Sequence, residues 1–251
     1  MHGFFPNRLL KPRALTGWAL TLMILASTVG CGGSGTPTSV PPTPTVSPVE
    51  ILRRASAQLA ATQTVHFELT VEGKTFVDAD KKIELLSASG DLERPDRVFT
   101  TFKAKALGAA TVTIKLITVG DQSWTTNILT GRWGAAPPEF AYQPTILFDN
   151  QQGIGPVLGR VEGATELTDD SVNGRQTYHI KADVDETVIG PLTMETMTGS
   201  PVTLDMWVDR ETDDLLRAQL AEPPGADREQ PATWTLNLSK HGEKVAIEPP
   251  I

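Results

Sequence analysis

The residue with the clearest chemical signature is Cys31, the only cysteine in this chain of 251 residues. Small residues precede it in Ser27-Thr28-Val29-Gly30. This pattern is typical of a bacterial lipobox, in which the cysteine thiol receives acyl chains such as palmitate and becomes the mature N-terminus. The single departure is Thr28, where a lipobox usually carries Leu. We predict lipidation at Cys31.

The segment before Cys31 has the layout of an export signal. Three basic residues, Arg8, Lys11 and Arg13, precede an apolar run over residues 17–26. That run is about half of the ~20 residues that a membrane-spanning helix needs. Residues 1–31 are therefore predicted to be a lipoprotein signal peptide, rather than an ordinary signal peptide or an uncleaved anchor. The protein should be exported and lipid-anchored on the outer side of the cytoplasmic membrane.

No other group of residues indicates catalysis. The histidines after the signal are His66, His179 and His241, which lie on separate segments without a metal-binding spacing. The chain lacks a G-x-S-x-G elbow and a glycine-rich phosphate loop. We therefore predict no enzyme activity, no metal and no cofactor. Three acidic pairs match no calcium loop and are predicted to lie in turns: Asp169-Asp170, Asp183 with Asp185, and Asp213-Asp214.

The charge of the mature chain excludes some partners. Removing residues 1–31 leaves 19 Lys and Arg against 30 Asp and Glu, a formal charge of −11. A chain of this charge lacks the basic surface of a nucleic-acid-binding protein. An anionic lipid surface would repel it, so the acyl chains on Cys31 must hold it at the membrane. Because no second cysteine exists, the folded part must be stabilised by packing rather than by disulfides.

Residues 32–46 are rich in Gly, Thr and Pro and carry no charge. Such a segment is predicted to be a disordered, partly polyproline-II tether. At ~3.1 Å per residue it would extend on the order of 40 Å from the membrane. The folded domain should then span residues 47–251.

The folded part opens with a predicted helix and continues as strands. Ser47-Pro48-Val49-Glu50 predicts a capping box, and apolar residues recur at helical spacing up to residue 61. Alternating apolar and polar residues then predict strands joined by short turns, hence a mostly antiparallel sheet in an α+β domain. The predicted strands cover residues 66–72, 83–92, 98–104, 111–119, 122–126, 176–183, 202–209, 215–221 and 233–239.

Residues 137–159 break this alternation, since they are too irregular for a strand and too apolar for an exposed loop. They are predicted to form one or two short helices lying across the sheet. The residues predicted to face the interior between helices and sheet are Phe67, Leu69, Val71, Val112, Ile114, Leu116, Phe148, Ile154, Leu158, Leu204, Met206 and Trp234. Val208, Leu236 and Leu238 share the same inward alternation. Alternation cannot distinguish a filled core from the wall of a cavity.

The order of motifs resembles the LppX/LprA/LprF/LprG lipoproteins, best known from mycobacteria. The resemblance covers nearly all of the mature chain and rests on diffuse patterns after the lipobox and tether. These are residues 90–97 (GDLERPDR), 131–133 (GRW), 148–158 (FDNQQGIGPVL), 202–209 (VTLDMWVD) and 238–250 (LSKHGEKVAIEPP).

The resemblance implies a U-shaped half-barrel, a curved antiparallel sheet with helices on its concave face around an apolar cavity, as in the related LolA/LolB-like lipid carriers. It implies that the twelve residues predicted to face the interior line a lipid cavity. The implied ligand is a long-chain envelope lipid or glycolipid that is bound and transferred or presented without catalysis, and a membrane lipid transporter is a possible partner. The alternative is a non-transporting envelope lipoprotein that acts as a sensor or scaffold through protein contacts. A cavity of several hundred Å³ would favour the carrier, and a filled core the scaffold.

Overall fold

A computed structural model describes residues 46–76, 82–106, 110–137, 144–161, 163, 164, 166–193, 197, 201–222 and 231–250. All of these belong to one compact unit, Pro44–Ile251. The predicted signal, Cys31 and residues 32–45 of the predicted tether lie outside the described residues.

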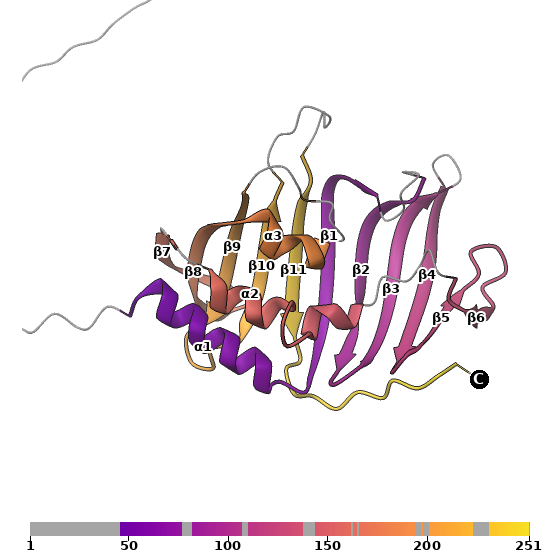
Figure 1. The fold of residues 1–251 in the computed structure, drawn as a ribbon, viewed down its shortest axis with the longest axis horizontal. Helices are drawn as coiled ribbons and strands as arrows, with labels where there is room; N and C mark the ends of the chain where they lie inside the picture. Colours follow the sequence, from indigo (N-terminus) through magenta and orange to yellow (C-terminus); the bar gives the residue numbers. More distant parts are fainter. Residues whose placement is uncertain are drawn as a thin grey trace, which may run out of the picture. The chain divides into compact units, whose positions relative to one another are not determined.

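The unit is built on one open antiparallel sheet of eleven strands in the order β6-β5-β4-β3-β2-β1-β11-β10-β9-β8-β7 (Figure 1). This arrangement confirms the predicted α+β fold with a single curved sheet. The strands are β1 (Thr64–Phe76), β2 (Glu84–Glu93), β3 (Arg97–Ala106), β4 (Ala110–Val119), β5 (Gln122–Thr126), β6 (Trp133–Ala135), β7 (Glu166–Val172), β8 (Arg175–Val184), β9 (Val202–Asp209), β10 (Leu215–Ala221) and β11 (Thr233–Ser239).

The sheet consists of two runs of sequential hairpins that meet at its centre. Strands β1 to β6 form one run and β7 to β11 form the other. The first and last strands join them, since His66 to Glu72 of β1 pair with Ser239 to Thr233 of β11. The central contact is therefore made by residues that are far apart in the sequence.

Nine strands lie where the alternation predicts them, and the two that it misses are the edge strands. β6 is short and contains Gly134, whereas β7 reads ELTDDSV and has little apolar alternation. An edge strand needs no continuous apolar face, and charged side chains there discourage pairing with other chains. The prediction that Asp169-Asp170 lies in a turn is therefore wrong. Both residues belong to β7, and Asp170 accepts a hydrogen bond of 2.8 Å from the indole N–H of Trp207.

The first helix, α1 (Pro48–Ala61), begins and ends as predicted. The Ser47 hydroxyl accepts a hydrogen bond of 3.2 Å from the backbone N–H of Glu50, which satisfies a free donor of the first turn. The Glu50 carboxylate does not complete the predicted capping box, because it pairs with the guanidinium of Arg53 at 2.7 Å. The buried stripe of α1 is Ile51, Leu52, Ala55 and Leu59.

Four short helices complete what we call the helix layer together with α1: η2 (Pro144–Phe148), α2 (Ile154–Arg160), α3 (Glu186–Ile189) and η3 (Gly190–Thr193). The first two confirm the short helices predicted within residues 137–159, of which 138–143 lie outside the described residues. In Figure 1, α1, α2 and α3 lie in front of strands β7 to β1. No labelled helix lies in front of β3 to β5 in that view.

Arg94, in the turn between β2 and β3, connects the sheet to the helix layer. Its guanidinium donates hydrogen bonds to the carbonyl oxygens of Thr62 at 2.9 Å, Leu59 at 3.3 Å and Phe148 at 2.7 Å. It also lies over the Phe148 ring, 4.7 Å from the centroid. The last carbonyls of α1 have no partner within the helix, so a cation at this position both satisfies them and complements the helix dipole.

A second polar cluster holds α1 against the hairpin of β9 and β10. Gln58 of α1 donates to Asp214 at 3.0 Å, and Arg54 donates to Asp213 at 3.1 Å. Arg175 of β8 pairs with Asp209 at 2.8 Å and with Asp214 at 3.2 Å. Because Asp209 and Asp214 are buried, each carboxylate depends on these donors to remain ionised.

The pKa values of Asp209, Asp214 and His241 in this part of the structure are all lowered, for different reasons. Burial would raise the pKa of Asp209, but the backbone N–H groups of Thr212 and Glu211 and the Arg175 guanidinium outweigh it, so the pKa is lowered. Burial likewise opposes the ionised form of Asp214, and hydrogen bonds from Thr212 and Gln58 lower its pKa overall. Burial lowers the pKa of His241, which contacts the Leu215 carbonyl at 3.2 Å.

We predict that Arg94→Ala lowers the free energy of unfolding by about 2–4 kcal/mol, because three carbonyl groups lose a charged donor. Arg94→Lys should have an intermediate effect, since one ammonium group cannot bond all three carbonyls. Urea unfolding at neutral pH measures both. The control is Arg53→Ala, which removes an exposed pair on α1 and should change the urea midpoint little. Equal effects at the two sites would contradict the role of Arg94.

We also predict that stability falls in two steps on acidification. His241 has a lowered pKa in the folded protein, so the unfolded chain takes up its proton first and stability declines as pH falls below about 6.5. Asp209 and Asp214 stabilise the fold above the usual Asp pKa, and their contribution disappears as pH falls below about 4. Urea titrations from pH 8 to 3 measure the free energy of unfolding at each pH.

His241→Gln should remove the first step, and Asp214→Asn should weaken the second. An unchanged pH profile in either variant would refute the assignment of that step.

Candidate functional site

A largely apolar pocket lies between the inner face of the sheet and the helix layer. Its walls come from eight strands, from Ile83 directly before β2, and from four helices. The lining residues are Phe67, Leu69, Ile83, Leu85, Ala88, Thr100, Phe102, Ala104, Ile114, Leu116, Thr125, Leu147, Ile154, Val157, Leu158, Ile189, Leu192, Leu204, Ala218, Leu220, Trp234 and Leu236. The pocket is the candidate site because it brings together residues from both runs of the sheet.

One cross-strand row shows how the sheet forms the pocket. Through the strand registers, Ile180, Met206, Ala218, Leu236, Leu69, Ala88, Phe102 and Ile114 lie side by side from β8 to β4. Residues opposite one another on paired strands share a face of the sheet. From Ala218 to Ile114 this row lines the pocket, whereas Ile180 and Met206 are fully buried in the packed core. The same row is thus core at one end and pocket wall at the other.

A β-bulge increases the contribution of β2. The pairing of β2 with β3 shifts register between Leu85 and Ser87, so Leu85 lies opposite Ala104 while Ala88 lies opposite Phe102. Three residues apart, Leu85 and Ala88 would point to opposite faces of a regular strand. The bulge lets both side chains line the pocket, and it bends the strand at this point.

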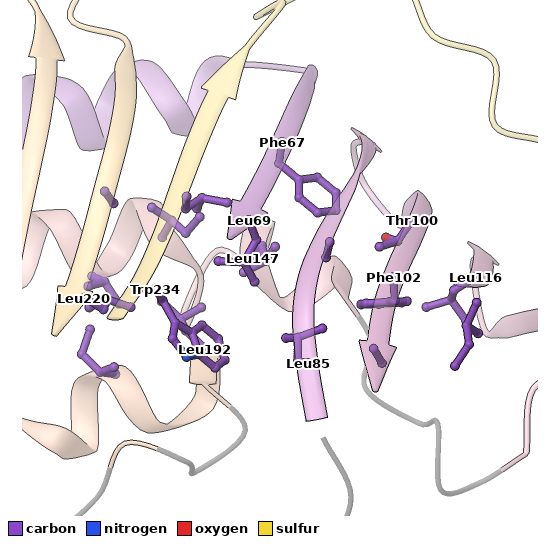
Figure 2. Close-up of a pocket in the computed structure, with 18 of the residues that line it drawn as sticks. Phe67, Leu69, Leu85, Thr100, Phe102, Leu116, Leu147, Leu192, Leu220 and Trp234 are labelled. Atoms are coloured by element: carbon purple, nitrogen blue, oxygen red, sulfur yellow. The ribbon is translucent and has the colours of Figure 1, made fainter. Parts of the chain in front are cut away.

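The helix layer supplies the opposite wall. Leu147 of η2, three residues of α2, Ile189 of α3 and Leu192 of η3 face the sheet across the pocket. Figure 2 shows Leu147 and Leu192 close to Leu69 and Trp234, with Leu220 on one side and Phe102 and Leu116 on the other. The Trp234 indole N–H donates to the Thr75 hydroxyl at 3.0 Å, which leaves the apolar ring to form part of the wall.

The wall contains no Asp, Glu, Lys, Arg or His among its lining residues, and its only hydroxyl groups are those of Thr100 and Thr125. A site of this composition binds apolar groups by excluding water from them. It offers no charged group that would bind an ion or act as acid, base or nucleophile. The chemistry that it supports is burial of hydrocarbon.

The pocket has a cavity volume of about 140 Å³. One water molecule needs roughly 10–15 Å³ of cavity volume, so side chains do not fill this part of the interior completely. The volume falls below the several hundred Å³ expected of a carrier and below the roughly 300–1,000 Å³ of typical ligand sites. The pocket therefore differs from a filled core without reaching the size expected of a complete lipid cavity.

The structure places most of the residues predicted to line a cavity at this pocket. Those that line it are Phe67, Leu69, Ile114, Leu116, Ile154, Leu158, Leu204 and Trp234. Val71, Val112, Phe148 and Met206 lie elsewhere. Met206 is covered at the end of the sheet where α1 contacts β9, and Phe148 lies beneath the Arg94 guanidinium. Val112 lies on a part of β4 that β5 does not reach, and Val71 borders the register shift of β1.

Sequence reasoning missed the contributions of β2, β3, β5 and β10 and those of the short helices α3 and η3. The predicted strands were correct there, but Ala88, Ala104 and Ala218 are small and Thr100 is polar, so none of them marks an apolar face. Most of the missed residues of β2 and β3 lie opposite inward residues of β1 and β4 that were predicted, so the strand register would have identified them. Register depends on pairing, which a single sequence does not show.

The histidines and acidic residues do not converge on this pocket. His66 pairs with Asp91 at 2.7 Å, and His179 pairs with Asp205 at 2.7 Å while stacking on Trp207. In the part of the chain that the structure describes, no three His, Cys, Asp or Glu side chains lie where they could share a metal ion. Within the same ranges, the helices are too short or too polar to cross a membrane.

Known proteins resemble this chain in sequence or in fold. The lipoarabinomannan carrier protein LprG of Mycobacterium tuberculosis is 28% identical over 237 residues, which cover 92% of this chain and 94% of LprG. The crystal structure of LprF from Mycobacterium bovis matches with a TM-score of 0.64 at 21% identity, covering 81% of this chain and 96% of that one. That of Mycobacterium tuberculosis LppX matches with a TM-score of 0.56 at 15% identity, covering 80% and 98%.

The two crystal structures establish the likeness of the fold, an open antiparallel sheet with a few helices. The family match adds the sequence pattern, which extends from the N-cap of α1 to the buried Ile247 near the C-terminus. Since residues 47–247 match the LppX_LprAFG lipoprotein pattern, this chain belongs to that family.

Proposed function

We propose that this protein is a membrane-anchored lipoprotein that binds the acyl chains of envelope lipids in its pocket and transfers or presents them without catalysis. The observation that carries the proposal is the pocket, whose wall is apolar except for two threonine hydroxyls and which is large enough to hold part of a lipid. The related LprG is named a lipoarabinomannan carrier, which supports a lipid or glycolipid as the ligand.

The physical reason for such a carrier is the insolubility of acyl chains. Exposing a chain to water costs about 0.8 kcal/mol per CH₂ group, so a long-chain lipid leaves the membrane slowly unless another apolar surface receives it. The inner face of the sheet provides this surface across β1 to β5 and β9 to β11. The pocket also favours the carrier over the non-transporting scaffold, which needs no unfilled interior.

We further propose that acylated Cys31 anchors the protein on the outer side of the membrane and that residues 32–46 form the tether. The anchor would keep the pocket near its lipid source, while the negative charge of the domain would limit its direct contact with anionic headgroups. A protein anchored in this way could pass its lipid to a partner in the same membrane, such as a lipid transporter.

The central test is extraction of the purified protein. The chain from residue 32 onward contains the whole folded unit and carries no covalent lipid. Expressed in a host with a cell envelope and extracted with organic solvent, it should release long-chain lipid in near-stoichiometric amount, identified by mass spectrometry. Absence of lipid, together with no binding of an added fluorescent fatty acid, would refute the proposal.

Ala104→Phe tests the position of the ligand. Ala104 is buried on β3 and lines the pocket, so a phenyl ring there should fill space that an acyl chain needs. We expect fluorescent fatty-acid affinity to fall about tenfold or more, equivalent to about 1.4 kcal/mol. The matched control is Thr101→Phe, since Thr101 lies three residues away on β3 and points to the other face of the strand. Circular dichroism checks that both fold, and equal affinities would contradict the assigned pocket.

Cys31→Ala in the full-length chain tests the anchor. Without the thiol no acyl chain can be attached, so mass spectrometry should find the variant without the added mass of acylation. A second comparison uses a fusion of the domain to an ordinary cleavable signal, which has no lipidated cysteine. In extraction with the detergent Triton X-114, the mature wild-type protein should enter the detergent phase, and the fusion should stay in the aqueous phase. Detergent partitioning of that fusion would contradict anchoring through Cys31.

A further inference from the structure

The Thr100 hydroxyl is a polar group buried in the pocket wall without a hydrogen-bond partner. Thr100 is 0% exposed and lies on the inner face of β3. Its Oγ1 has no hydrogen-bond partner among the residues that the structure describes. Buried hydroxyl groups are nearly always hydrogen-bonded, because leaving one unpaired in an apolar environment is unfavourable. Valine has nearly the same shape and would fill this position without that penalty.

The described residues beside Thr100 in the sheet offer no side-chain partner for its hydroxyl. Through the strand registers, its neighbours in the row are Gly90 on β2 and Leu116 on β4. Its inward neighbours along β3 are Val98 and Phe102. The next hydroxyl in the row, Thr125, lies two strands away, roughly 10 Å at ordinary strand spacing. Because Thr100 lines the pocket, a molecule bound there is the partner that its hydroxyl can meet.

Gly90 fixes the surface beside Thr100. A Cβ atom on Gly90 would lie 1.8 Å from the Phe99 carbonyl oxygen, so no other residue fits there without a shift of the backbone. The row from Phe67 to Thr100 thus has no side chain on β2. In Figure 2, the Phe67 ring extends from β1 towards Thr100, whose hydroxyl oxygen is drawn beside the pocket. The groups around the hydroxyl are apolar, and the backbone keeps them close.

The chemistry of the pocket limits what the hydroxyl can meet. Water would need two to four polar partners, and here it would find one. A phosphate, an amine or a sugar would bring several polar groups or a charge into a wall without a charged residue. An ester carbonyl is an uncharged acceptor joined directly to an acyl chain, so it requires one donor and no more.

Resting on the proposed lipid binding, we infer that the Thr100 hydroxyl donates a hydrogen bond to an ester carbonyl oxygen of the bound lipid. This contact makes Thr100 a specificity-determining residue that selects ester-linked acyl chains over ether-linked alkyl chains. It also fixes how far a chain enters the pocket, since the carbonyl marks the end of the hydrocarbon.

The test compares two lipids that differ only at this group, dipalmitoyl phosphatidylglycerol and its dihexadecyl ether counterpart. Their affinities for the delipidated chain from residue 32 onward are measured by displacement of a fluorescent fatty acid. The wild-type protein should bind the ester about three- to tenfold more tightly, as expected for one net hydrogen bond. Thr100→Val should bind both lipids with equal affinity, close to that of the wild type for the ether.

Thr177→Val is the matched control. Thr177 is also fully buried with an unpartnered hydroxyl, but it lies on β8 outside the pocket lining. Both valine variants should unfold at the same or a slightly higher urea concentration, whereas only Thr100→Val should lose the ester preference. Thr100→Ser should keep the preference and Thr100→Ala should lose it, which provides a second pair if the valine variant misfolds.

The outcomes separate the two proposals. Equal affinity of the wild type for both lipids, or an unchanged ester preference in both Thr100→Val and Thr100→Ala, would overturn the role of Thr100 and leave lipid binding intact. Failure of the wild type to bind either lipid or the fluorescent fatty acid would overturn lipid binding itself, and the role of Thr100 with it.

Discussion

The rest of the structure depends on how the described helices meet the inner face of the sheet, since they pack closely on one part of it and line a pocket over another. At the β8 and β9 end, Ile180 and Met206 are sealed within the core. Towards β4 the same cross-strand row continues through Phe102 and Ile114, which line the pocket instead. A sheet must bury one face, and the described helices pack closely on only part of this one. The remaining part forms the wall of the apolar pocket.

Polar contacts keep the helix layer in place at the margins of the apolar interior. Arg94 holds the end of α1 and the carbonyl of Phe148, and the Asp209 and Asp214 cluster holds α1 to the β9–β10 hairpin. Dispersion and water exclusion have no preferred direction, so they would allow the helices to collapse onto the sheet. Directional bonds to fixed carbonyl and carboxylate groups set the spacing from which the pocket results.

Much of this architecture could be predicted from the sequence, because period and turn chemistry are local. The helix beginning at Ser47 and the strands with alternating faces needed no knowledge of their neighbours. The edge strand β7 could not be predicted, since its acidic residues lie at the edge of the sheet and give no apolar alternation. Thr100 could not be predicted either. Its place in the pocket wall depends on Gly90 and Leu116, which lie beside it only because the strands pair.

The pairing of β1 with β11 has a consequence for how the molecule is made. His66 finds its partner Ser239 only once nearly the entire chain is present, so neither run of hairpins can complete the sheet alone. Contacts of such sequence separation form slowly. A polypeptide of this topology stays unfinished while it emerges from a ribosome or threads through a translocation channel. It reaches its final shape only when β11 has joined β1.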